Sequence, residues 1–210
     1  MYSLPHFKAA NEEEVIAFMH AHPFITLCGV DASGKPVATQ VPVLFDERDG
    51  KLFLQAHIMR KQDHTVAFEQ NPNVLAIFSG AHTYVSASWY EKNNSAGTWN
   101  YQAVHAKGTL RFLDEAGLYK LLVKLTDTFE NNPHSPALVH KMDEGYVASL
   151  IKAIIGFDIE ITDIEHVFKL SQNRDEKSYE NITHHLLEGD ADARTIAETM
   201  DRRKDQVFHQ

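Results

Sequence analysis

Residues 57–72 read HIMRKQDHTVAFEQNP and contain a predicted strand-to-helix step together with the main candidate site. The run at 51–58, KLFLQAHI, is β-rich, whereas residues 61–70 have helical character that Asn71-Pro72 stops. A strand therefore delivers Arg60 and Lys61 to a helix start, where cations beside free backbone N–H groups form an anion site. The alternative is a solvated basic pair. Because cations at a helix start are mildly unfavourable for the helix dipole, a bound anion is a reasonable explanation for them.

Short β-rich runs and turn signals continue on both sides of this stretch. Residues 31–34 (DASG) and 47–50 (ERDG) indicate tight turns, and Pro42 indicates an edge strand or a bulge. Strands joined by hairpins favour a mainly β fold with inserted helices, of the α+β class, built on a closed antiparallel barrel rather than a doubly wound parallel sheet. The predicted strands are 24–30, 36–45, 51–58, 74–80, 83–90, 98–113 and 156–172 (the last as one strand or a pair), and the predicted helices are 12–21, 61–70, 114–132, 144–152, 175–187 and 190–205.

The best candidate for a domain boundary lies near residues 173–176, where the strand pattern gives way to a polar helical tail. We therefore expect a barrel domain over residues 1–175. Residues 176–210 should form a helical C-terminal tail packed on that domain or extending from it. The sequence gives little indication that the last helix, 190–205, is deeply buried.

Composition restricts the functional class. The chain has 210 residues, a formal net charge of −9 and a single cysteine, Cys28. It shows no apolar run long enough to span a bilayer and no signal-peptide pattern, so we expect a cytoplasmic protein. The acidic balance disfavours direct DNA binding by a lone subunit. The 13 histidines are scattered without metal-ligand spacing, so no metal is predicted. The motifs of dinucleotide folds, P-loop enzymes and α/β-hydrolases are absent.

Two aromatic-rich segments could carry a binding site. In residues 81–90, AHTYVSASWY, regular alternation would place His82, Tyr84, Ser86 and Ser88 on one face. In residues 98–105, TWNYQAVH, the large aromatic side chains could contact a ligand or could simply fill the barrel or an interface. Residues 169–173, KLSQN, could reach a phosphate or could cap the following helix.

The motifs taken together resemble a known family. The segment from Arg60 to Asn71-Pro72 looks like the flavin-phosphate segment of pyridoxamine-phosphate-oxidase-like split barrels, with Met59 in place of a serine. Over residues 1 to about 185 the chain is similar to the PaiB family of FMN-binding negative transcriptional regulators. The similar motifs, in order and spacing, are MYSLPHF, HPFITL, GKP followed by ATQVP, AIFSGAHTYVSASWY, GTWNYQAVHAKG, IIGFDIEI and KLSQN.

This resemblance implies a split β-barrel of the FMN-binding type, with flavin mononucleotide (FMN) as cofactor. It further implies a homodimer with flavin at the interface and a role in negative regulation of transcription. Gln40 stands where the family more often has a histidine, although its amide can still donate a hydrogen bond. The cofactor-binding residues implied are Thr39, Gln40, His57, Arg60, Lys61, Ser86, Trp89, Tyr90, Trp99, Asn100, Tyr101 and Lys169, with His105 as a weaker candidate.

Two other functions use the same residues. A flavin-dependent oxidoreductase acting on a small molecule would need the same site, because the flavin carries the redox chemistry and the protein orients it. No residue stands out as a general base, so no catalytic residue is assigned. A flavin-free interaction protein that keeps the barrel is the third class. Some related split barrels handle haem, but no feature here selects an axial ligand.

Overall fold

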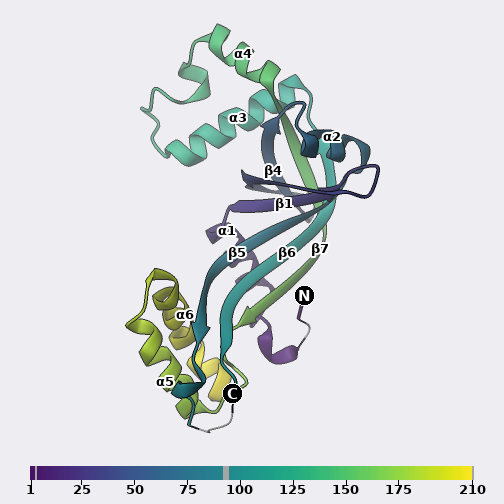
Figure 1. The fold of residues 1–210 in the computed structure, drawn as a ribbon. Coiled ribbons are helices and arrows are strands. Elements are labelled where there is room, and N and C mark those ends of the chain that lie inside the picture. Colours follow the sequence, from purple (N-terminus) through teal and green to yellow (C-terminus); the bar gives the residue numbers. More distant parts are fainter. Residues whose placement is uncertain (3, 92–94, 210) are drawn as a thin grey trace. The chain divides into compact units, whose positions relative to one another are not determined.

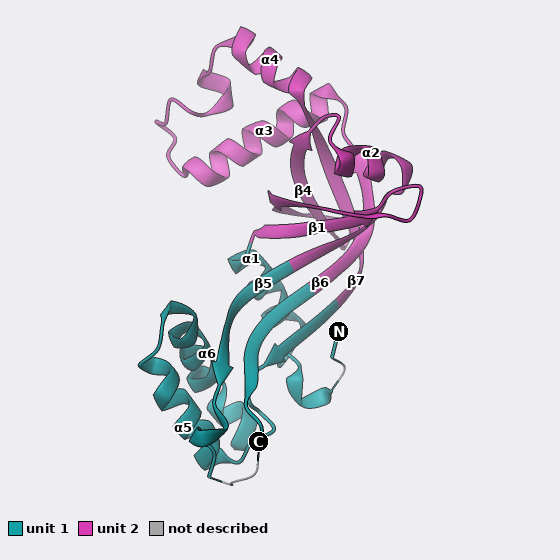
Figure 2. Ribbon diagram, viewed as in Figure 1, with its two compact units in different colours: residues 1–22, 78–104, 165–210 teal, residues 23–77, 105–164 magenta. Residues whose placement is uncertain are grey.

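The computed structural model describes residues 1–2, 4–91 and 95–209. The chain divides into two compact units, shown in Figure 2. Unit 1 consists of Met1–His22, Phe78–Val104 and Glu165–Gln210, and unit 2 consists of Pro23–Ile77 and His105–Ile164. The last two helices are thus part of the same compact unit as the N-terminal segment.

In the described part of the chain the strands form a seven-stranded sheet of order β2-β1-β5-β6-β7-β4-β3 (Figure 1). The pairs β1–β2, β1–β5, β3–β4 and β4–β7 are antiparallel. The expected antiparallel, mainly β fold with inserted helices is confirmed. The strands are β1 Phe24–Val30, β2 Pro36–Pro42, β3 Leu44–Arg48, β4 Lys51–Met59, β5 Asn73–Val85, β6 Thr98–Phe112 and β7 Ile154–Lys169.

The inserted helices begin where short polar side chains cap them. Asn11, Asp114 and Asp175 each accept a hydrogen bond from a backbone N–H in the first turn of the helix that follows. Such caps satisfy donors that have no partner inside the helix. Among the described helices none is long and apolar enough to cross a membrane. The helices are α1 Glu12–Ala21, α2 Asp63–Gln70, α3 Glu115–Glu130, α4 Glu144–Ala153, α5 Glu176–Leu187 and α6 Ala191–Phe208, with short 3-10 turns η1 Pro5–Phe7, η2 Ala87–Trp89 and η3 Val139–Lys141.

Two strand predictions differ from the structure. The predicted strands 74–80 and 83–90 are one strand, β5, that ends at Val85. After it the chain enters η2, because the Ser86 Oγ accepts the Ser88 N–H at 3.2 Å and starts a turn. The expected alternation of side chains therefore stops at Tyr84. The predicted strand 36–45 ends at Pro42, in β2 at the end of the sheet order, as expected for a proline in an edge strand.

Unit 2 has a helical core beside its strands. Leu118, Leu121 and Leu125 of α3 are buried at helical spacing, as the sequence predicted. They pack in one cluster with Val147 of α4 and Ile154 at the start of β7. This cluster fixes the point where the chain leaves α4 and enters β7.

Unit 1 buries the last helix, contrary to the expectation from sequence. Ile196, Ala197 and Met200 of α6 are fully buried, and the Tyr179 hydroxyl of α5 donates to the Met200 carbonyl oxygen at 2.8 Å. Burial raises the pKa of Tyr179, which remains protonated. The signal was present in the spacing of Ala193, Ile196, Ala197 and Met200, which lie on one face of a helix.

We predict that Ile196→Ala lowers the free energy of unfolding by about 2–5 kcal/mol, because it opens a cavity in a fully buried site. Chemical denaturation followed by circular dichroism measures this change. Glu198→Ala, on the exposed face of the same helix, is the matched control and should leave stability nearly unchanged. Equal effects of the two substitutions would contradict the burial of α6.

Candidate functional site

Unit 2 contains a cavity of about 540 Å³ at the segment that the sequence analysis singled out. Three strongly polar groups of the implied site line it: Thr39 and Gln40 of β2, and His57 of β4. The size falls in the range of small-molecule pockets. Other lining residues are Met59, Gln62, His64 and Ile154.

The pairing of β4 with β7 places the end of β4 beside this cavity. His57 is opposite Gly156 and Met59 is opposite Ile154, and the Arg60 N–H continues the ladder by donating to the Ala153 carbonyl oxygen at 2.9 Å. Immediately after this bond the chain turns sharply. β4 therefore ends at Met59, directly before the turn.

Lys61 makes the turn with a φ of 61°, in the left-handed region that a non-glycine residue adopts only at a cost of about 1–2 kcal/mol. The Thr65 hydroxyl then stabilises the start of α2 by donating a hydrogen bond to the Met59 carbonyl oxygen at 2.7 Å. Gln62 precedes α2 and does not cap it with its side chain. Local strain at this basic turn is typical of functional sites.

The two cations at the turn have no carboxylate partner among the residues that the structure describes. Arg60 is half-buried and Lys61 is exposed, and neither forms an ion pair within the part of the chain that the structure describes. The acidic residue nearest in sequence, Asp63, instead bonds the His64 N–H at 2.7 Å and lies 3.3 Å from the His64 Nδ1. The positive charge of the turn is thus available to an anion.

His57 provides the observation that tests whether a ligand fits. Its Nδ1 is buried and has no hydrogen-bond partner among the described residues. Burial lowers the pKa of His57, so the ring is held neutral, with one nitrogen able to donate and one to accept. A buried polar atom without a partner is rare, and a polar ligand in this cavity would supply one. The residues present therefore fit a polar cofactor.

The other implied residues lie in unit 1. Trp89 stacks on His185 with ring centroids 5.0 Å apart, and the Arg174 guanidinium lies 4.0 Å from the centroid of Tyr90. The Ser86 Oγ is 2.8 Å from the Ser88 Oγ. The Tyr90 hydroxyl is buried without a partner among the described residues. Ser86 and Trp89 thus have local structural partners, whereas the Tyr90 hydroxyl has an unused hydrogen-bonding capacity.

Two of the candidate residues, Asn100 and Lys169, have hydrogen-bond partners within the protein. Asn100 is fully buried; its amide nitrogen lies 3.4 Å from the Met200 sulfur, and its oxygen accepts from the Ser171 hydroxyl at 3.0 Å. The Lys169 ammonium donates to the Thr98 hydroxyl at 2.6 Å, and burial, followed by the charge of Arg174, lowers its pKa. Asn100 has the geometry of a core residue rather than of a ligand contact.

Trp99 and Tyr101 instead face a shallow cavity of about 290 Å³ on the surface of unit 1. Trp99 is 52% exposed, and its ring lies 6.0 Å from His82 and 6.1 Å from Tyr84. Gln102 also lines this cavity, whereas His105 falls in unit 2. The structure thus brings Thr39, Gln40 and His57 together in one unit and Trp99 and Tyr101 together in the other.

Several residues that line the unit 2 cavity are not among those predicted from the sequence. Gln62 and His64 line the unit 2 cavity because the left-handed turn at Lys61 directs the start of α2 toward it. Their positions in the sequence, two and four residues after Arg60, are the feature that could have identified them as cavity residues. Ile154 also lines the cavity, through strand pairing nearly a hundred residues away in sequence, which no local pattern contains. No group of three metal-ligating side chains is found among the described residues.

The fold and the two cavities define a class of protein: an antiparallel β protein with a cofactor-sized pocket beside a basic turn. The family model described as "Putative FMN-binding domain" matches residues 1–163. The chain belongs to this family. The expected FMN-binding split-barrel fold and FMN as the cofactor are thereby confirmed.

One curated relative and two solved structures are similar to this chain. "Protease synthase and sporulation protein PAI 2" from Bacillus subtilis is 35% identical over 209 residues, covering 99% of this chain and 100% of the relative. The structure of an FAD and haem binding protein from Mycobacterium smegmatis matches with a TM-score of 0.56 and 16% identity, covering 77% of this chain and 72% of that one. A flavocytochrome from Azotobacter vinelandii matches with a TM-score of 0.53 and 19% identity, covering 76% and 68%. At such identities these two structures support the fold alone.

Proposed function

We propose that this protein is a PaiB-like, FMN-dependent negative regulator of transcription that holds the FMN phosphate at the Arg60-Lys61 turn. The observation that carries the proposal is the pair of cations without carboxylate partners in the described residues, directly after the strand that lines a 540 Å³ cavity. The full-length similarity to the sporulation protein of Bacillus subtilis supports the regulatory part. When bound, the flavin would supply redox chemistry and a flat aromatic surface.

Different residues of unit 2 would bind different parts of the cofactor. Arg60 and Lys61 would neutralise the phosphate through charge-assisted hydrogen bonds. The Thr39 hydroxyl and the Gln40 amide are polar groups of β2 on the same cavity. The unpartnered Nδ1 of His57 would receive a hydrogen-bond partner from the ligand.

We predict that Arg60→Ala weakens FMN binding about 10- to 100-fold, because a hydrogen bond to a charged group is lost. Titration of the apoprotein, followed by quenching of FMN fluorescence, measures the affinity. Arg111→Ala is the matched control, since it removes an exposed arginine of β6 in the same unit. An unchanged affinity in Arg60→Ala would remove this residue from the phosphate site.

We also propose that the protein forms a homodimer with flavin at the interface. Its support is the exposed aromatic group formed by His82, Tyr84 and Trp99 in unit 1. Aromatic side chains are enriched at the centres of protein interfaces and supply much of their binding energy. The Tyr101 ring would extend this group along the same cavity. The single cysteine agrees with assembly in a reducing cytoplasm.

We predict that Trp99→Ala weakens dimerisation at least about tenfold and reduces retained flavin, because it removes the most exposed large ring of this group. Light scattering over a dilution series measures the dimer, and absorbance near the flavin bands measures retention. Phe129→Ala is the control, because Phe129 is 53% exposed on α3 and lies outside the group. A monomeric wild type at all concentrations would reject the dimer.

A flavin-dependent oxidoreductase is the second candidate, and the same cavity favours it equally. The net charge of −9 disfavours direct DNA binding by a lone subunit, so we propose that regulation acts through a partner protein or through flavin chemistry.

We predict that the loaded protein shows no salt-sensitive, sequence-selective binding to promoter DNA by itself. Gel-shift or anisotropy titrations at two salt concentrations measure this. Tight, selective binding by the lone protein would overturn the indirect form of regulation. Sustained NAD(P)H oxidation with a small-molecule acceptor would instead favour the oxidoreductase.

A further inference from the structure

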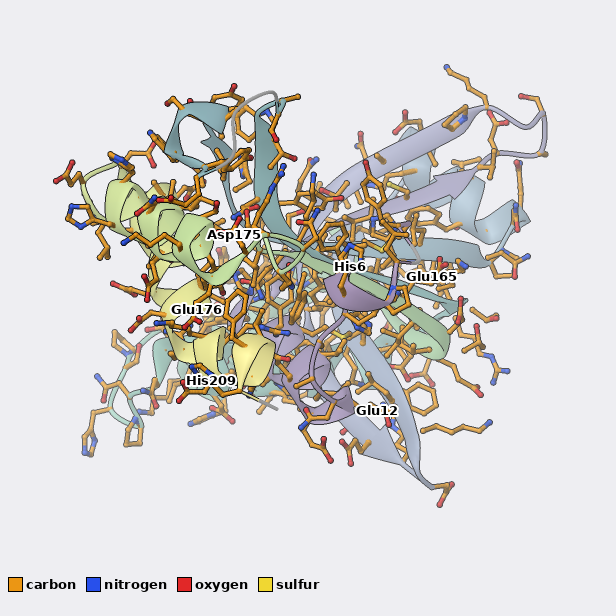
Figure 3. The ribbon with its side chains drawn as sticks, turned by 90° about the horizontal axis from the view of Figure 1, so that it is seen from below. His6, Glu12, Glu165, Asp175, Glu176 and His209 are labelled. Atoms are coloured by element: carbon orange, nitrogen blue, oxygen red, sulfur yellow. The ribbon has the colours of Figure 1, made fainter. Side chains whose placement is uncertain are left out.

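Unit 1 contains a polar cavity of about 380 Å³ that none of the flavin-site residues lines. Its walls come from η1 and the residues after it, and from the last turns of α6; Figure 3 shows His6 on η1 and His209 at the end of α6. The volume is within the range of small-molecule sites. Its polar lining residues are His6, Lys8, Gln172, Arg203 and Gln206.

Arg203 of α6 connects the two walls of this cavity through its contacts with Glu14 and Lys8. The residue is only 7% exposed, and its guanidinium binds the Glu14 carboxylate and donates to the Lys8 carbonyl oxygen at 3.0 Å. Its Nε is buried and has no hydrogen-bond acceptor among the described residues. Buried donors are rarely left unpaired, so the cluster lacks an acceptor.

Lys8 adds a second cation, which has no carboxylate partner in the described part of the chain. Its ammonium donates to the His166 carbonyl oxygen at 3.1 Å and, within the described ranges, forms no ion pair with a carboxylate. An ammonium has three donors, so this single bond to a carbonyl leaves hydrogen-bonding capacity for a ligand.

The two charged residues among those that line the cavity, Lys8 and Arg203, are both cations. Both oxygens of Glu14 are engaged, one by Arg203 and the other by the Ala10 N–H at 2.6 Å. His166 accepts the Ala9 N–H on its Nε2 at 3.0 Å. Burial, and then the charge of Lys8, lowers the pKa of His166, in agreement with an excess of positive charge at this place.

We propose that this cavity binds a small organic oxyanion, a carboxylate or a phosphate ester. The Lys8 ammonium and the Arg203 side chain hold the anionic group. His6 and Gln206, which are exposed at the cavity, bond the polar body of the ligand. Occupancy stabilises the folded protein, because the ligand binds both η1 and α6. The site is independent of the proposed flavin function.

Isothermal titration calorimetry on the FMN-loaded full chain tests this proposal, with inorganic phosphate, succinate and citrate as separate probes. We expect saturable binding of at least one probe, and the arm that binds identifies phosphate or carboxylate as the preferred chemistry. Lys8→Gln should weaken that binding about tenfold. Lys120→Gln, which removes an exposed lysine on α3 in unit 2, should leave it unchanged.

A second variant, Gln206→Trp, fills the cavity from an exposed position of α6 and should abolish binding without unfolding the protein, as judged by circular dichroism. Flavin absorbance is recorded throughout, so that displacement of FMN by phosphate is recognised as an event at the Arg60 turn. Absence of saturable heat with all three probes overturns the proposal. Equal affinity of wild type and Lys8→Gln does so as well.

Discussion

The antiparallel pairing of β4 with β7 is the interaction on which the arrangement of unit 2 depends. It joins residues about a hundred positions apart, from Phe53 opposite Glu160 to Met59 opposite Ile154. The backbone bond from Arg60 to Ala153 closes the ladder, and the chain then turns at Lys61, whose φ lies in the left-handed region. The basic turn is therefore a consequence of where the sheet ends. The cavity of Thr39, Gln40 and His57 lies beside it for the same reason.

An acidic protein can bind anions when it separates a few cations from its carboxylates. The chain carries a net charge of −9, yet neither Arg60 nor Lys61 forms an ion pair among the described residues. At the second cavity, Arg203 is nearly buried and keeps one carboxylate, Glu14, while Lys8 has none among the described residues. Local pairing, and not the overall charge, decides whether such a site attracts an oxyanion, because surface charges more than about 10 Å apart are largely screened.

Much of the fold could be predicted, because its signals are local. The helix starts at Asn11, Asp114 and Asp175 follow from capping side chains, and the buried face of α3 follows from its leucine spacing. The site was predicted less evenly. Thr39, Gln40 and His57 do line one cavity, whereas the polar side-chain atoms of Asn100 contact Ser171 and Met200. The difference arises because the residues beside a side chain in sequence do not indicate its partners across the sheet or from α6.

The amino-acid sequence alone predicts the class of the protein, because its β-rich runs and turns favour an antiparallel sheet and its ordered motifs resemble an FMN-binding family. It also determined where two cations meet a helix start. The packing of distant segments leaves Arg60 and Lys61 without carboxylate partners in the described residues and buries α6, and neither outcome is visible in the sequence. The physical reason is that charge pairing and burial depend on which distant segments pack together, whereas strand, turn and cap signals are complete within a few residues.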